Sequence, residues 1–391
     1  MVKRVILLAA TALAVAAAAP VEAIPAFARR YDVSCHFCHD GYPKLNSMGQ
    51  RFRERGFRME KEDAFALDKW ARTVPVDLRA SGTHYFVEKG DDFNSGFLKG
   101  VSAGSLGRRL SYWIDDGVLI SEGDKTFTHT KPDNAWGRVE IIPAGKLYAK
   151  GGRLELDLPF TQTRTSHLFS YDIYFANTGS ERDAIGFFQD GVEVGGQLPR
   201  DMHWSAAVVA GHDAAGAGDV DSRAERFDGN LFLRLAKRIN QHRVGAFAYV
   251  GRNTLVRSAT NTADDNLLRL GADASVWVQR LNLYGVAMYG RNDNSIFDPR
   301  VSGGAGQALS FSGGFAQADY HVRDDLVLTL RANLVSRPTS ASPGVNPRQS
   351  LASLFPGLQF FVRERLKLAF EYGFLNQDRS DIGAVQVDLA F

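Results

Sequence analysis

Alternation of apolar and polar residues is the feature that most constrains the fold of this chain. Residues 326–334 read LVLTLRANL, so that the even positions are apolar while Thr329, Arg331 and Asn333 share the other side. The same alternation recurs in three further segments, 154–158, 231–236 and 366–374. Because successive side chains of a strand point to opposite faces, each segment predicts a strand with one apolar and one polar face. A soluble β-sandwich would alternate in the same way, so this pattern leaves both classes open.

The lengths of the connections favour a membrane barrel. Short polar turns are predicted at nearly even spacing, near 199–202, 239–241, 279–281, 323–325 and 363–365. Longer polar segments lie between them, at 213–225, 254–265, 292–306 and 337–348. Short turns at one end and long loops at the other, joined by strands of roughly 10 residues or more, are typical of outer-membrane barrels. After the N-terminal leader, no apolar run is long enough for a helical span.

The C-terminal residues add an independent signal. Val385, Val387, Leu389 and Phe391 alternate with polar or small residues, and the sequence stops at the aromatic side chain. A terminal amphipathic strand ending in phenylalanine resembles the signal read by the bacterial outer-membrane assembly machinery, so Phe391 is the predicted barrel-assembly signal. Seventeen segments, 168–176 among them, read as strands. A single-chain barrel with both ends on one side needs an even number.

We therefore predict an all-β fold: a transmembrane antiparallel β-barrel of about 16 strands over residues 71–391. The surplus strand segment is expected between 90 and 150, where the rhythm of short and long connections breaks. A barrel of this size encloses a lumen rather than a packed core. Outer-membrane lipid is the expected surrounding.

The first residues predict export. Lys3 and Arg4 precede an apolar run over 5–19, and Val21-Glu22-Ala23 supplies a small-x-small cleavage site. Residues 1–23 are therefore a predicted signal peptide. The chain has 46 Lys and Arg against 44 Asp and Glu, and this near balance argues against a nucleic acid as a partner.

One motif carries a specific chemistry, the run Cys35-His36-Phe37-Cys38-His39. C-x-x-C-H is the spacing that attaches a c-type haem, with two thioethers to one porphyrin and the following histidine on the iron. The only two cysteines of the chain both lie in it. A redox dithiol would need a βαβ context, and a zinc site using His36 and His39 would lack a second ligand pair. The motif predicts one covalent haem c on Cys35 and Cys38, with His39 as axial ligand.

Residues 24–70 are predicted to form a small helical cytochrome module and linker. A helix is expected from Pro43, in its first turn, to about Arg55, with Gly56 as the C-cap. A module of this length buries little surface by itself, so haem and the barrel wall must complete its core. The module is therefore expected to lie in or at the barrel lumen.

Four residues are predicted to surround the haem. Leu45 and Phe52 share a helix face suited to packing on a porphyrin. Arg29 and Arg30 precede the motif and could pair with haem propionates, because guanidinium groups bind carboxylates in a bidentate manner.

The second axial ligand has three candidates. Met48 lies on the apolar helix face, but it is close to His39 in sequence for a ligand on the opposite haem face. Met59 and His84 are the alternatives, His84 if the first strand points it inward. The remaining histidines are scattered singly and do not suggest a metal cluster.

The motif and its flanks resemble a known family. IPAFARR at 24–30, the C-x-x-C-H motif, PKLN at 43–46, Gly49, Phe52 and Gly56-Phe57 are similar to the fused monohaem cytochrome–porins of bacterial outer membranes, whose best-known members are iron(II) oxidases. The resemblance covers about 35 residues, and the barrel matches as an architecture. It implies electron passage across the outer membrane between an extracellular donor, such as iron(II), and a periplasmic c-type cytochrome or other carrier.

Three functions follow from these features. The first is an electron conduit, which would be an iron(II):cytochrome c oxidoreductase if iron(II) is the donor. The second is a porin for solute diffusion whose haem module is a plug or gate. A soluble periplasmic haem enzyme such as a peroxidase is the third, but the sequence shows no second haem site or paired acid–base residues to support it.

Overall fold

The computed structural model describes residues 26–59, 76–123, 125–127, 132–161, 167–176, 184–210, 229–258, 261–296, 307–338, 348–363, 366–376 and 380–390. The predicted signal peptide and Phe391 lie outside these residues.

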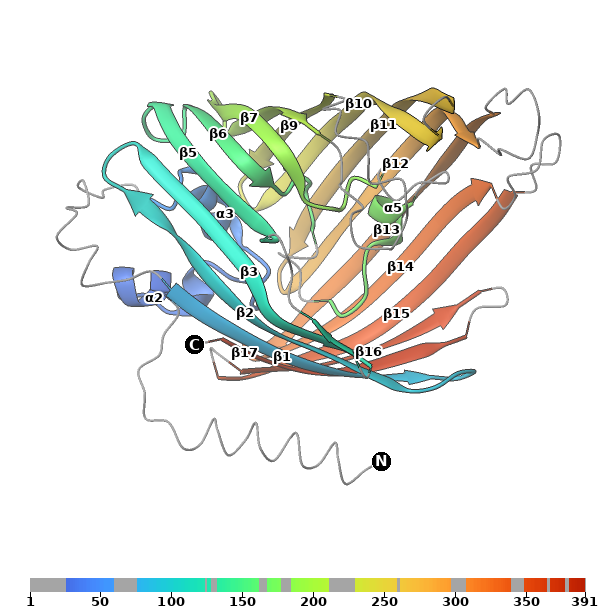
Figure 1. Ribbon diagram of the computed structural model, residues 1–391. Coiled ribbons are helices and arrows are strands. Elements are labelled where there is room, and N and C mark those ends of the chain that lie inside the picture. Colours follow the sequence, from blue (N-terminus) through green and yellow to red (C-terminus); the bar gives the residue numbers. More distant parts are fainter. Residues whose placement is uncertain are drawn as a thin grey trace.

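One antiparallel sheet dominates the structure (Figure 1). Its strands are β1 (Val76–Val87), β2 (Phe93–Leu106), β3 (Leu110–Glu122), β4 (Lys125–Phe127), β5 (Asn134–Ile142), β6 (Leu147–Leu154), β7 (Gln189–Leu198), β8 (Met202–Val209), β9 (Asn230–Ile239), β10 (His242–Ser258), β11 (Asn261–Val278), β12 (Leu281–Ile296), β13 (Gln307–Arg323), β14 (Leu326–Pro338), β15 (Arg348–Arg363), β16 (Leu366–Leu375) and β17 (Ile382–Ala390). The helical elements are α2 (Ala26–Tyr31), the 3-10 turn η1 (Cys35–Phe37), α3 (Ser47–Glu54) and α5 (Asp172–Phe175). None of the helices in the described part of the chain has the length and hydropathy to cross a membrane.

The sheet closes on itself. β1 pairs with β2 on one side and with β17 on the other, from Arg79 opposite Ala390 to Val87 opposite Ile382. Of the 17 strands in the described residues, β4 is a three-residue extension on the end of β3, and β3 pairs directly with β5. The closed ring therefore has 16 strands, as the sequence predicted.

The surplus segment lies elsewhere than expected. The segment 168–176 is not a strand, because the chain leaves the wall after Leu154, forms α5 inside the barrel, and returns at Gln189. We call the described residues between these points, 155–161, 167–176 and 184–188, the inward segment. The alternation of short and long connections is irregular between 90 and 150 because the short strand β4 pairs with the end of β3.

Each strand has a polar inner face and an apolar outer face. On β9, Arg234 and Arg238 are buried on the lumen side, whereas Leu233 and Leu235 are 43% and 46% exposed on the outside. β14 repeats this arrangement, with Arg331 buried. Polar residues inside and apolar residues outside are the reverse of a soluble protein and the arrangement of a barrel that lies in lipid.

Short connections gather at one end of the barrel, which we call the short-turn end. They are 107–109, 143–146, 199–201, 240–241, 279–280 and 324–325. Left-handed residues tighten several of them, including Asp201 and Asn240 with φ of 56° and 57°. One predicted long loop is corrected: at 254–265, β10 continues to Ser258 and β11 begins at Asn261. A strand that extends beyond the bilayer can be polar on both faces, so its sequence resembles that of a loop.

The inward segment packs against the lumen wall through apolar and aromatic side chains. Tyr171 stacks on Phe315 of β13 at 3.9 Å between ring centroids, and Phe160 lies 4.6 Å from Tyr284 of β12. Arg331 of β14 donates a hydrogen bond to the Phe169 carbonyl at 2.7 Å. This part of the lumen therefore has a hydrophobic core of its own.

Candidate haem site

The C-x-x-C-H motif folds as a tight turn in the N-terminal module, residues 26–59. The amides of Cys38 and His39 donate to the Cys35 carbonyl at 3.2 and 3.0 Å. Both cysteine side chains are half-buried, and no disulfide joins them. The turn thus presents two separate sulfur atoms and an imidazole from five consecutive residues.

Helix α3 supports this turn from behind. The Asn46 side chain accepts from the Gly49 amide at 2.9 Å, as an N-cap, and donates to the His36 and Phe37 carbonyls at 3.1 Å each. A Cβ on Gly49 would stand 2.2 Å from the Cys38 carbonyl oxygen, so only glycine allows this approach. The helix therefore begins at Ser47 rather than near Pro43, because Asn46 caps it.

The motif faces a cavity between the module and the barrel wall. Cys35, Cys38 and His39 line it together with side chains of β1, β2, β3 and β5 and with Ala390 of β17. Its apolar lining includes Phe27, Leu45, Phe52, Phe57, Trp113 and Trp136. The space between these residues is about 1570 Å³, counting the part open to solvent.

The residues present fit a covalent haem. The donor set is two thiols three residues apart and an adjacent imidazole, all on one aromatic-walled cavity. Burial lowers the pKa of His39 to about 4, against the opposing effect of the Pro43 and Lys44 backbone groups, so the ring is neutral near pH 7. Neutral imidazole is the form that ligates metals. Its Nδ1 atom is buried without a hydrogen bond of good geometry.

Only some of the other predicted site residues line the cavity. Leu45 and Phe52 line the cavity, as does Met59. Met48 is 40% exposed and is not part of the lining. Nor does His84 line it, because its neighbour Thr83 is the buried lumen-side residue and its Nδ1 is 2.7 Å from the exposed Asn94 side chain.

Of the two arginines predicted to lie near the haem, the structure describes the side chain of Arg30 only. Arg30 donates to Ser105 Oγ on β2 at 3.1 Å, and it lies over the Tyr31 ring. The Arg29 side chain lies outside the described residues. Arg53, Arg79 and Lys99 line the cavity, each within 4 Å of a carboxylate of the chain.

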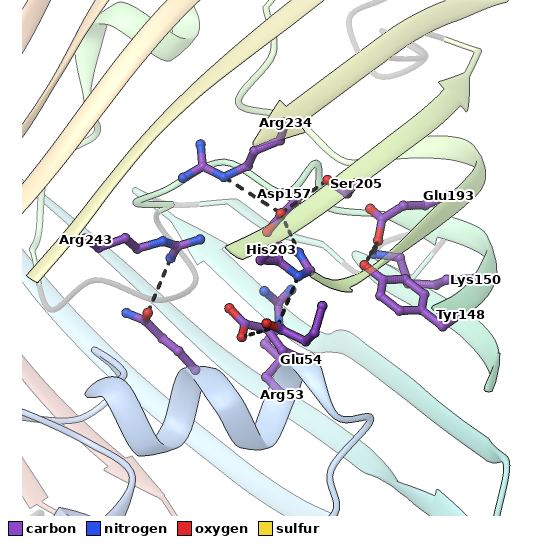
Figure 2. Close-up of polar contacts among 12 residues, drawn as sticks. Arg53, Glu54, Tyr148, Lys150, Asp157, Glu193, His203, Ser205, Arg234 and Arg243 are labelled. Carbon is purple, nitrogen blue, oxygen red and sulfur yellow. Dashed lines mark hydrogen bonds and ion pairs between the residues drawn. The ribbon is translucent and has the colours of Figure 1, made fainter. Parts of the chain in front are cut away.

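Polar contacts hold the module against the wall. Glu54 accepts from Arg238 of β9 at 3.1 Å and from Gln197 of β7 at 2.7 Å, and its own carbonyl accepts from Arg138 of β5 at 2.7 Å. Figure 2 shows Glu54 at the end of α3, below His203 of β8. Burial alone would raise the pKa of the Glu54 carboxyl, but His203, Arg238 and Arg243 outweigh it and leave that pKa below its ordinary value.

A second anchor lies on the other side of the module. Lys44 Nζ is 2.7 Å from both Asn282 of β12 and Asp319 of β13, and it lies 4.3 Å from the centre of the Tyr284 ring. Tyr284 in turn donates to Asp319 and meets His167 of the inward segment at 3.0 Å. The module and the inward segment are thus connected through shared lumen residues.

Sequence reasoning missed the wall residues of this site. Trp113 and Trp136 are directly opposite each other on β3 and β5, and both line the cavity. Their inward position follows from strand alternation, but their meeting with the motif depends on the barrel register. Among the described residues, the motif included, no group of three or more His, Cys, Asp or Glu lies close enough together to hold a metal ion.

Comparisons with known proteins bear on the barrel. Neither a protein-family model nor a curated protein matches the sequence. Among solved structures, OmpF of Salmonella typhi in complex with daunomycin aligns with a TM-score of 0.60 at 11% identity, covering 81% of this chain and 97% of that one. This chain has the fold of the outer-membrane porins.

Other structures with the porin fold align similarly. The outer membrane channel DcaP of Acinetobacter baumannii has a TM-score of 0.56 at 10% identity, covering 81% of this chain and 96% of that chain. The anion-selective porin of Comamonas acidovorans has a TM-score of 0.53 at 12% identity, covering 81% and 98%. The similarity to these porins concerns the fold.

Proposed function

We propose that the protein lies in the bacterial outer membrane and transfers electrons through one haem c held inside its porin-type barrel. The observation that carries the proposal is that both motif thiols and His39 line one aromatic cavity within the barrel. The apolar exterior and the porin fold support the location.

The residues of the cavity have distinct parts in this proposal. When bound, haem c supplies a one-electron couple. Cys35 and Cys38 would hold it covalently, and neutral His39 would bind the iron. The aromatic walls exclude water, and burial is one of the means by which a protein tunes a haem potential. Arg53, Arg79 and Lys99 are the cations of the lining, and porphyrin carboxylates would share them with the carboxylates of the chain that they already contact.

The position of the module supports a periplasmic partner. The module's contacts include Asp201, Gly107 and Gly145, all in connections of the short-turn end. Phe37, between the two cysteines, is 39% exposed. A periplasmic c-type cytochrome or another carrier could approach the site from this end. An extracellular redox partner such as iron(II) would approach from the long-loop end, and the resemblance of the motif region supports iron(II).

Solute diffusion is the second candidate function. The porin fold favours it, since the structures that align include an outer membrane channel and an anion-selective porin. The module would then be a plug or gate. Both the module and the inward segment occupy the lumen, and this reduces the path left for solutes.

Reconstitution distinguishes the two functions. The full-length protein is purified in detergent, its haem is measured by pyridine haemochrome, and it is placed in liposomes that enclose an oxidised cytochrome c. External iron(II) is expected to reduce the enclosed acceptor with the wild-type protein and not with a Cys35→Ala/Cys38→Ala variant. Absence of covalent haem, or of haem-dependent reduction, would overturn the electron-transfer function. Solute leakage from the same liposomes would then support the channel function.

A further inference from the structure

The proposed function leaves the second axial position of the haem iron to be assigned. Met59 is the only thioether, and His39 the only imidazole, among the described residues that line the cavity. The exposed Met48 and the outward His84 do not share this lining. His36 is exposed and lies between the two anchoring cysteines.

The chain just before Met59 is held in a fixed path. Gly56 and Phe57 are both left-handed, with φ of 65° and 62°, so the chain reverses after α3. A Cβ on Gly56 would stand 2.7 Å from Ser111 Oγ, in addition to the strained conformation. The reversal brings the chain back to the cavity instead of away from it.

Contacts on both sides hold this reversal. The Phe57 ring is buried and stacks on Phe27 and Trp136, at 5.1 and 5.9 Å between ring centroids. Tyr31 donates to the Phe57 carbonyl at 3.0 Å, and Arg58 donates to the Leu110 carbonyl at 2.6 Å. Met59 therefore follows a segment that is attached to the module and to the wall at once.

The surroundings of Met59 suit a neutral sulfur ligand. It packs against the apolar cluster of Phe52, Phe57, Ala103, Trp136 and Leu154. A thioether carries no charge and tolerates such a site, and its ligation raises the potential of a haem relative to a second histidine. A haem of high reduction potential can accept electrons from a donor couple whose own reduction potential is high, such as iron(III)/iron(II).

We propose that Met59 is the second axial ligand of the haem iron, opposite His39. The proposal rests on the proposed function, because it requires a covalent haem in this cavity. It assigns a role to a residue outside the C-x-x-C-H motif.

Spectroscopy of the full-length protein in detergent tests this assignment. Wild type, Met59→Leu, Met59→His and the control Met48→Leu are compared for pyridine haemochrome, for the near-infrared absorption of thioether-bound ferric haem, and for midpoint potential. We expect the absorption in wild type and Met48→Leu, its loss in Met59→Leu with haem content unchanged, and a lower potential in Met59→His.

Other outcomes overturn the assignment. Retention of the thioether absorption in Met59→Leu, or its loss in Met48→Leu, would transfer the role to another residue. Wild-type protein with full covalent haem but no thioether absorption would reject Met59 and leave the proposed function standing. Wild-type protein without covalent haem would reject both.

Discussion

The N-terminal module and the inward segment both lie in the lumen, and both use polar and aromatic contacts with the wall, but in different proportions. The module is held by several charged side chains, such as Lys44 and Glu54, and by the stacking of its Phe57 ring on the wall. The inward segment belongs to the larger apolar core, as with Tyr171 on Phe315, and makes polar contacts besides. Directional contacts fix position, whereas apolar packing fills space, so we expect the loss of one charged contact to displace the module more than the inward segment.

The largest effect is expected from a variant that removes the haem attachment residues and leaves the barrel intact. The Cys35→Ala/Cys38→Ala variant should lose all covalent haem, because no other cysteine exists in the chain. The charged anchors do not involve either thiol, so the barrel should still form. Pyridine haemochrome and the heat-modifiable mobility of the barrel on gels measure the two results. Loss of both together would contradict the separation of module and barrel.

Removing an aromatic side chain should loosen the inward segment alone. Phe315→Ala deletes a buried ring that contacts Tyr171, at a cost of about 3–5 kcal/mol. Single-channel conductance in planar bilayers should rise while haem content stays constant. Phe370→Ala, on the outward face of β16, is the matched control and should leave conductance unchanged. Equal conductance in both variants would show that the inward segment does not restrict the lumen.

Breaking a buried anchor should release the module. Lys44→Met leaves Asp319 buried without its cation, and removal of one partner of a buried pair costs about 3–5 kcal/mol. Hydrogen exchange of the α3 amides should quicken, while exchange in the strands stays slow. Unchanged exchange in α3 would show that Lys44 is dispensable for docking.

Acid should weaken the same attachment through Glu54. Because its folded pKa lies below the ordinary carboxyl value of about 4.3, ionised Glu54 stabilises the docked module above that pH. The contribution is lost as the pH falls through the lowered folded value. The protection factors of the α3 amides, which remove the pH dependence of intrinsic exchange, should fall in wild type across this acidic range, and Glu54→Gln should remove that part of the pH dependence. An identical profile in Glu54→Gln would exclude Glu54 as its origin.

The smallest effect is expected at the exposed contact between Arg51 and Asp201. This pair is 3.1 Å apart, but both side chains are more than a third exposed. Exposed pairs contribute about 0–1 kcal/mol. Arg51→Ala should therefore leave exchange in α3 nearly unchanged, which makes it the surface control for Lys44→Met. A change as large as that of Lys44→Met would mean that burial does not determine the strength of these anchors.

Much of the barrel could be predicted from the sequence, since strand alternation and turn spacing are local properties. The turns near 199–202 and 239–241 and the inner and outer faces of β9 and β14 are where the sequence predicts them. The segment 168–176 was wrongly predicted as a strand, because its short apolar run resembles one but has no strand partner in the ring. Its path inward is decided by contacts with residues such as Phe315, more than a hundred positions away.

The candidate site was predicted only in its local part. The spacing of Cys35, Cys38 and His39 is visible in the sequence, and so are the apolar residues Leu45 and Phe52, although Leu45 precedes the helix on which Phe52 lies. The wall of the cavity depends on which strands lie beside the module. No local pattern pairs Lys44 with Asp319, and Met48 could not be distinguished from Met59 without the reversal at Gly56.

The seam of the barrel gives the proposed haem site an order of assembly. Arg79 of the first strand binds Asp388 of the last at 2.9 and 2.5 Å, and both Arg79 and Ala390 border the cavity. The final wall of the chamber is therefore absent until the two ends of the cylinder join. Thioether formation needs open access to the thiols and would come first, while the chain is still in transit. Joining of the two ends would then complete the wall around the proposed haem, so that closure of the barrel and completion of the cavity are one event.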